Sequence, residues 1–137
     1  MKLQITSCDS SVEHSEGHLV DIPEGSNEYT FIHFLSPVLV KTSSGLTEVE
    51  AGACLMYTPH HPQFYRGAGG RWSYDYLSFS GSSSEKIALS GGFSMNEVFY
   101  PYRTHFISSL FEKMKTESLR RELNWERIAT LALEEFI

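Results

Sequence analysis

The side chains of this sequence that are best suited to chemistry are the polar aromatic residues of one alternating segment. Trp72, Tyr74 and Tyr76 are separated by single residues, and Leu77 and Phe79 follow in the opposite phase. Because successive side chains of a β-strand face opposite ways, the three polar rings share one face and the two apolar residues share the other. A Tyr or Trp ring offers a flat apolar face beside a hydrogen-bonding group, which suits a sugar or a similar small polar metabolite. The segment is therefore predicted to line a ligand cavity with one face and to pack with the other.

Further polar rings and histidines could line the same cavity. The side chains that we expect to bind a ligand are those of Tyr76, Tyr74, Trp72, Tyr65, His33, His61 and Tyr29. The alternative is that the rings only fill the core, since large rings dominate burial in small β domains. We favour the cavity, because every buried hydroxyl must find a hydrogen-bond partner and so many polar rings exceed what a dry core needs. Asp75 is the only carboxylate within the aromatic strand, and by parity it faces away from the rings.

The six histidines do not follow the pattern of a metal site. Such a site needs three or four ligands that converge on one ion, but His33 stands alone, and the adjacent His60 and His61 point oppositely on an extended strand. The other three, His14, His18 and His105, are expected outside the barrel strands. We therefore expect no metal, no cofactor and no catalytic residue, so the chain is predicted not to be an enzyme.

The elements that must position these residues are mostly short strands. Alternating or apolar segments predict strands near residues 29–34, 37–41, 46–50, 53–57, 63–66 and 72–79. Short helices are expected to begin at Ser82–Ser84 and at Ser94, where Glu97 completes a capping-box pattern. The division is an N-terminal arm (1–25), a barrel core (26–81), and short helices with a helical hairpin (82–137). This order predicts a mainly β fold with C-terminal helices, namely a cupin-like barrel or double-stranded β-helix followed by a helical hairpin.

The predicted helical hairpin carries two apolar stripes. Their members are Phe106, Leu110, Met114, Trp125, Ile128 and Ala132. At helical spacing these residues could cover the barrel or pair with a second copy, and we expect a homodimer without deciding between helices and barrel as its interface. The last helix would run to residue 137 without a capping residue, which suggests a cut within a longer protein.

Composition and charge narrow the partners. The formal net charge is −6 and no basic cluster stands out, so this chain alone is not expected to bind nucleic acid. No apolar run approaches the roughly 20 residues of a membrane helix. Cys8 and Cys54 are too few for a disulfide framework, which favours reduced thiols in a cytoplasmic protein.

The layout resembles the N-terminal effector-binding domain of AraC-type transcription regulators. The resemblance covers most of residues 20–137 and rests on the Gly52 turn, the apolar strand that runs to Pro59, the segment from Trp72 to Gly81, and the later Val98-Phe99-Tyr100. It implies a metal-free cupin barrel with a helical dimerisation hairpin, whereas DNA is bound by a C-terminal domain absent from this chain. It also implies a sugar-stacking role for Tyr76 and ligand contacts for Tyr74 and Tyr65.

The resulting hypothesis is a domain that senses a small carbohydrate and dimerises within a bacterial transcription regulator. Two alternatives stay open. One is a metal-dependent cupin enzyme, such as an isomerase or a dioxygenase, which would require a metal. The other is a dimerisation module whose barrel is filled and binds no ligand.

Overall fold

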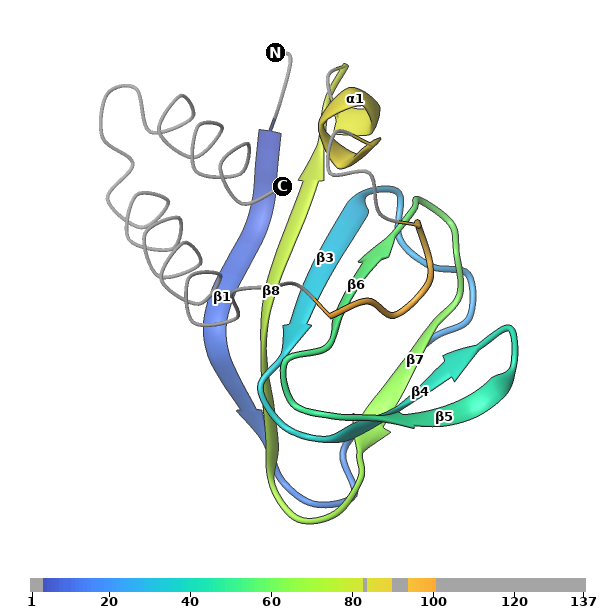
Figure 1. Cartoon of the computed structure of the whole chain (residues 1–137). Helices are drawn as coiled ribbons and strands as arrows, with labels where there is room; N and C mark the ends of the chain where they lie inside the picture. Colours follow the sequence, from blue (N-terminus) through green and yellow to red (C-terminus); the bar gives the residue numbers. More distant parts are fainter. Residues whose placement is uncertain (1–3, 83, 90–93, 101–137) are drawn as a thin grey trace.

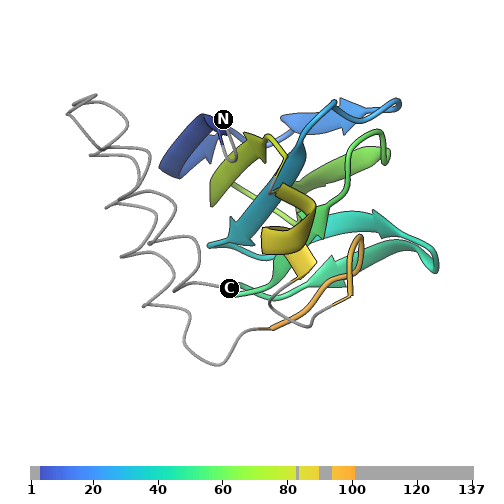
Figure 2. The ribbon, with the colours of Figure 1, turned by 90° about the horizontal axis from the view of Figure 1, so that it is seen from above.

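The structure, a computed structural model, describes residues 4–82, 84–89 and 94–100 as two antiparallel sheets of four strands that face one another (Figures 1 and 2). Sheet A contains, in spatial order, β1 (Gln4–His14), β8 (Trp72–Ser80), β3 (Tyr29–Phe34) and β6 (Cys54–Tyr57). Sheet B contains, in spatial order, β2 (Leu19–Ile22), β7 (Gln63–Gly67), β4 (Val38–Thr42) and β5 (Gly45–Val49).

This strand order is that of an eight-stranded jelly roll, the double-sheet architecture to which cupins belong. Apart from the β4–β5 hairpin, each described connection between consecutive strands crosses from one sheet to the other, as β7 to β8 does through residues 68–71. The predicted cupin-like β fold is therefore confirmed. The glycine-rich segment 67–70 therefore connects the two sheets and does not close a hairpin within one of them.

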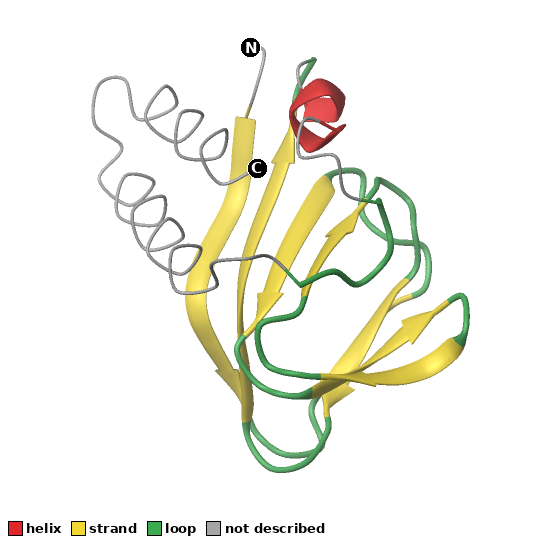
Figure 3. Ribbon diagram, viewed as in Figure 1, coloured by secondary structure: helices red, strands yellow, loops and turns green. Residues whose placement is uncertain are grey.

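Most predicted strands are confirmed within a residue or two, and the helix expected near Ser82–Ser84 is α1 (Ser84–Leu89), which packs against β3 (Figure 3). The helix expected at Ser94 is wrong. Residues 94–100 form a turn and an isolated bridge, because Asn96 takes a positive φ of 63° and Phe99 pairs with Cys54. The helical hairpin and its stripes, Phe106, Leu110, Met114, Trp125, Ile128 and Ala132, lie outside the described residues.

The segment expected to be an N-terminal arm contributes two barrel strands, so the barrel begins at Gln4 and not at residue 26. β1 runs along β8 for most of its length at the edge of sheet A, and β2 pairs with β7 at the edge of sheet B (Figure 1). Polar residues obscured β1 in the sequence. An edge strand needs few apolar side chains, and alternate residues of β1 face the barrel interior where the interior is polar.

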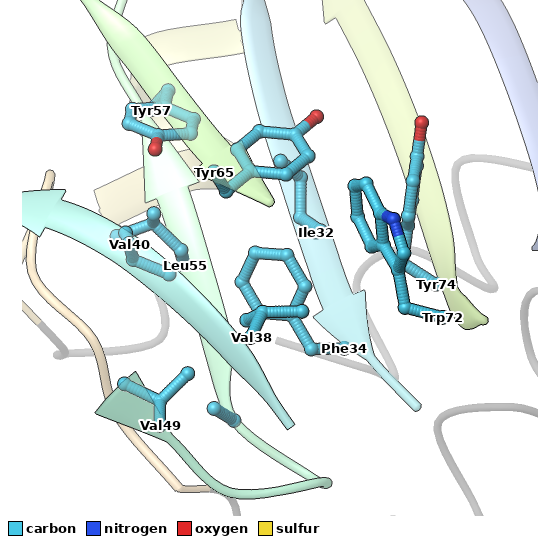
Figure 4. Close-up of a cluster of buried hydrophobic side chains, with 11 residues drawn as sticks. Ile32, Phe34, Val38, Val40, Val49, Leu55, Tyr57, Tyr65, Trp72 and Tyr74 are labelled. Atoms are coloured by element: carbon cyan, nitrogen blue, oxygen red, sulfur yellow. The ribbon is translucent and has the colours of Figure 1, made fainter. Parts of the chain in front are cut away.

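The core lies between the sheets and draws rings and aliphatic side chains from both (Figure 4). From sheet A come Ile32, Phe34, Leu55, Tyr57, Trp72 and Tyr74, and from sheet B come Val38, Val40, Val49 and Tyr65. Burying each such side chain contributes about 1.5–3 kcal/mol relative to leaving it exposed. The core therefore fixes which face of each strand points inward.

The register of sheet A shows the two faces clearly. Ile32 lies opposite Tyr76 and Phe34 opposite Tyr74, and these four side chains point into the barrel. In the other phase Phe31 lies opposite Leu77 and His33 opposite Asp75. We call this second face of sheet A, directed away from sheet B, the outer face.

Candidate ligand-binding site

A cavity of about 350 Å³ opens inside the barrel between the two sheets. Its walls combine three tyrosine rings with hydroxyl, amide and carboxylate groups and a few aliphatic side chains. The lining residues are Asp9, Val12, Val20, Ile22, Ser26, Glu28, Thr30, Gln63, Tyr65, Tyr74, Tyr76 and Ser78. The volume falls in the range of about 300–1,000 Å³ that is typical of small-molecule sites. A lining of aromatic rings with a few polar groups is typical of such sites as well.

The alternation of β8 places two of the three rings, as the sequence predicted. Tyr74 and Tyr76 both point inward, with ring centroids 6.1 Å apart. The third ring, Tyr65, comes from β7 in the opposite sheet and meets Tyr74 edge-on at 5.7 Å. The cavity is therefore bounded by tyrosine rings from both sheets.

A chain of hydrogen bonds crosses these strands. The Tyr65 hydroxyl bonds to the Tyr74 hydroxyl, and the Tyr74 hydroxyl lies 3.1 Å from Nε2 of His14 on β1. Burial is the main cause that raises the pKa of both tyrosines. Burial first, and then the charge of the stacked His18, lowers the pKa of His14, so its ring is neutral at neutral pH. Tyr74 can then donate to Nε2, and Figure 4 shows the Tyr65 and Tyr74 hydroxyls at the same end of the cluster.

Two carboxylates and a hydroxyl pair complete the polar lining. Asp9 enters from β1 opposite Tyr76, and its charge contributes to the raised pKa of Tyr74. Glu28 enters just before β3, and burial raises its pKa. On neighbouring strands the hydroxyls of Thr30 and Ser78 lie 3.1 Å apart. These groups can accept hydrogen bonds from a hydroxylated ligand.

The remaining predicted ligand residues lie elsewhere. Trp72 points inward but is 2% exposed and packs behind Tyr65, Tyr74 and His14 rather than lining the cavity. His61 stacks on Tyr57 and lines a second groove, which Lys41, Phe64 and Asn96 also line.

Tyr29 and His33 lie on the outer face, because β3 turns its other phase inward. Tyr29 stacks on Phe79 at 5.6 Å, and Nδ1 of His33 lies 3.0 Å from Oδ2 of Asp75. The structure therefore brings together only Tyr65, Tyr74 and Tyr76 of the predicted set.

The outer face holds a buried acid–imidazole pair that the sequence did not reveal. His33 and Asp75 are 2% and 1% exposed. Asp75 Oδ1 also accepts a hydrogen bond of 2.8 Å from the backbone N–H of Ser11, which has a φ of 52° within a β1 bulge. The expectation that Asp75 faces away from the rings is confirmed, and the side chain fastens β1 and β3 to β8.

Metal binding can be tested on the donor set of the described part of the chain. No group of three or more His, Cys, Asp or Glu side chains among those residues comes together in a way that could hold an ion. The His33–Asp75 pair offers only two donors. His14, expected outside the barrel strands, ends β1 beside Tyr74, where its neighbours are rings.

Sequence reasoning missed the carboxylates, Gln63, and the Thr30–Ser78 pair. Thr30 shares the phase of Ile32 and Phe34, so assigning that phase to the interior would have identified it. No comparable signal marks Asp9, whose strand pairs with one more than 60 residues away. Gln63, two residues before the predicted Tyr65, is buried and belongs to the lining of both the cavity and the groove that His61 lines.

Comparison with known proteins adds fold-level likeness only. No protein-family model and no curated protein matches the sequence. No helix in the described part of the chain is long and apolar enough to cross a membrane. One similar solved structure is the cupin_2 domain of an XRE-family transcriptional regulator from Enterobacter cloacae, with a TM-score of 0.39 and 13% identity over 49% of this chain and 73% of that one.

Two other similar structures come from larger proteins, of which the match spans about a third or less. Streptomyces albus HEPD, solved with its substrate 2-hydroxyethylphosphonate and Fe(II), has a TM-score of 0.36 and 15% identity over 86% of this chain and 29% of that one. Lactobacillus farciminis oxalate decarboxylase, solved with formate, has a TM-score of 0.33 and 12% identity over 89% of this chain and 32% of that one.

The prediction that the chain is not an enzyme is corrected by these findings. Structures similar to this chain include a decarboxylase and a protein with bound substrate, alongside a domain of a transcription regulator. The cupin-like fold therefore serves both classes of protein and decides neither for this chain. Function must be argued from the cavity itself.

Proposed function

We propose that this chain is the ligand-sensing barrel of an AraC-type transcription regulator and that a small carbohydrate binds in the cavity between the sheets. The observation that carries the proposal is the cavity of about 350 Å³ walled by Tyr65, Tyr74 and Tyr76. In this proposal a separate domain contacts DNA, and self-association through the predicted hairpin stays a prediction.

The chemistry of the lining supports a hydroxylated ligand. Ring faces suit the C–H face of a sugar, and the carboxylates of Asp9 and Glu28 with the oxygen of Gln63 can accept hydrogen bonds from its hydroxyls. The Thr30 and Ser78 hydroxyls can donate or accept. A filled barrel would have no such polar-lined space, so the cavity favours a sensor over a module that only dimerises.

The testing experiment is a thermal-shift screen of the full chain against monosaccharides. A ligand that binds only the folded state at 100 times its dissociation constant adds about 2.7 kcal/mol to the free energy of unfolding. For a domain of this size that corresponds to a rise in midpoint of several degrees. A selective rise for one sugar is the expected result, and a panel without any rise would overturn the proposal.

Substitutions of two tyrosines test whether the ligand binds in the cavity. Tyr76→Ala removes a ring from the cavity, whereas Tyr29→Ala removes the same ring from the outer face of the same sheet. We expect the sugar response to disappear in Tyr76→Ala and to persist in Tyr29→Ala, each measured against its own ligand-free midpoint. Tyr76→Phe, which keeps the ring, should retain most of it. An equal loss in both alanine variants would contradict binding in the cavity.

A further inference from the structure

Several polar groups of the cavity wall are already bonded within the chain. The Tyr65 hydroxyl bonds to that of Tyr74, and the Tyr74 hydroxyl lies 3.1 Å from Nε2 of His14. The hydroxyls of Thr30 and Ser78 lie 3.1 Å apart. A ligand can use only the hydrogen-bonding capacity that these internal bonds leave over. These groups therefore do not by themselves require a ligand.

Two other polar groups of the same wall are not bonded by the chain. Among the described residues, neither the side-chain amide of Gln63 nor the hydroxyl of Tyr76 has a hydrogen-bond partner. Gln63 begins β7 and is 3% exposed, and Tyr76 lies on β8 in the opposite sheet. Polar groups buried in proteins are nearly always bonded by the chain, by water or by a ligand. Each sheet thus contributes one group whose partner must enter the cavity.

The Gln63 amide stays in contact with the cavity. The side-chain atoms of the described residues that lack both a partner and contact with solvent are Oε2 of Glu28, Nε2 of His33, the Tyr57 hydroxyl and Nε1 of Trp72. The amide of Gln63 is not among them, so its unbonded atoms remain accessible. Gln63 shares the phase of Tyr65, two residues further along β7, and this phase turns both side chains toward the cavity.

A primary amide in this place selects for two neighbouring groups on the ligand. Its oxygen accepts hydrogen bonds and its NH2 group donates them, and both are attached to one carbon. Two neighbouring hydroxyls of a sugar match this pair, because one can donate to the oxygen while the other accepts from the NH2 group. A ligand that displaces water from the amide without replacing its hydrogen bonds loses affinity. The amide therefore favours a pair of neighbouring hydroxyls over an isolated one.

We propose that Gln63 is a specificity-determining residue of the cavity and that its amide binds two hydroxyl groups on neighbouring carbons of the ligand. This role rests on the proposed function, since it specifies how a sugar is recognised in the same cavity. It also names the feature of the sugar that is recognised, and it belongs to a residue that the sequence did not mark.

The test compares monosaccharides with their deoxy analogues by calorimetry on the full chain. Glucose, galactose, mannose and arabinose are measured first, and each sugar that binds is then compared with its analogues that lack a single hydroxyl. We expect two analogues altered at neighbouring carbons each to bind about ten-fold or more weakly than the parent sugar. In Gln63→Met, which keeps the shape of the side chain but removes the amide, these two losses should shrink to less than about three-fold.

The matched control is Tyr76→Phe, because it removes a polar group from the opposite wall and leaves the amide in place. It should keep both losses at the neighbouring carbons. If those losses persist in Gln63→Met, or if no two neighbouring carbons show a loss, the role of Gln63 is wrong and the sensor proposal stands. If no monosaccharide of the panel binds, both proposals are wrong.

A measurement without any sugar separates a binding role of the amide from a structural one. An amide that the chain leaves unbonded does not stabilise the fold, so an apolar side chain of similar shape should replace it without loss. We expect Gln63→Met to unfold at the same urea concentration as the wild type or at a higher one. Thr30→Val, which removes a hydroxyl bonded to Ser78, should unfold at a lower concentration. A midpoint of Gln63→Met lowered as far as that of Thr30→Val would overturn the inference.

Discussion

The buried pair on the outer face yields the sharpest prediction about stability. Asp75 accepts hydrogen bonds from the Ser11 N–H at 2.8 Å and from His33 Nδ1 at 3.0 Å, and the Asp75 and His33 side chains are almost fully buried. Asp75→Ala leaves both donors without this acceptor. His33 is buried, and a buried group deprived of its partner costs about 1–3 kcal/mol; Ser11 is exposed, so water can bond to its N–H and the second loss adds less. The combined loss is a substantial part of the roughly 5–15 kcal/mol by which domains are stable.

The measurement is urea unfolding of the full chain followed by tryptophan fluorescence, with the slope checked for two-state behaviour. Asp75→Asn should lose less than Asp75→Ala, because an amide has the shape of a carboxylate and its oxygen still accepts one bond. Glu13→Ala is the control. Its bond to Arg71 is also 3.0 Å long, but both groups are more than half exposed, so the variant should lose less than about 1 kcal/mol. The reasoning would be refuted if Asp75→Ala cost no more than Glu13→Ala.

Two further predictions concern the turn before β3. Gly25→Ala should lower the free energy of unfolding more than Gly70→Ala. Both glycines have a φ near 70°, but an added Cβ at Gly25 would collide with the backbone of His60 and His61, whereas Gly70 faces open space. The difference between the urea midpoints of the two variants measures this effect. Burial raises the pKa of Glu28 above its ordinary 4.5, so the folded state holds this proton more tightly than the unfolded chain and stability falls as pH rises through the raised pKa. Glu28→Gln should flatten that slope above pH 4.5 and be the more stable protein at neutral pH. An unchanged slope would show that Glu28 does not cause it.

The sequence was sufficient to predict which way side chains face in a strand with one polar-aromatic and one apolar face. In β8 the alternation of Tyr74 and Tyr76 with Asp75 and Leu77 assigned each side chain to the correct face. In β3 it failed, because Phe31 to Phe34 are all buried and the strand has no solvent-facing phase. A strand buried on both faces has no period-2 signal, so its register follows from its neighbours.

The remaining features depend on contacts between residues far apart in the chain. β1 is polar and contains a bulge at Ser11, and only its pairing with β8, some 60 residues later, makes it a strand. Contacts between residues far apart in the chain also outweighed the capping-box pattern at Ser94. Asn96 Oδ1 accepts a bond of 2.9 Å from the Thr58 N–H, and its own N–H bonds to the Met56 carbonyl, so tertiary contacts replace a short helix of low intrinsic stability.

The two faces of β8 can be understood together. On the inner face Tyr74 and Tyr76 shape the cavity, and on the outer face Asp75, the residue between them, holds the Ser11 bulge of β1. That bulge falls between Asp9 and Val12, so the residue that places the Asp9 carboxylate in the cavity is anchored from the other side of the sheet. Asp75, which is hydrogen-bonded through both oxygens, thus lies away from the cavity, whereas Asp9 on the anchored strand lines it.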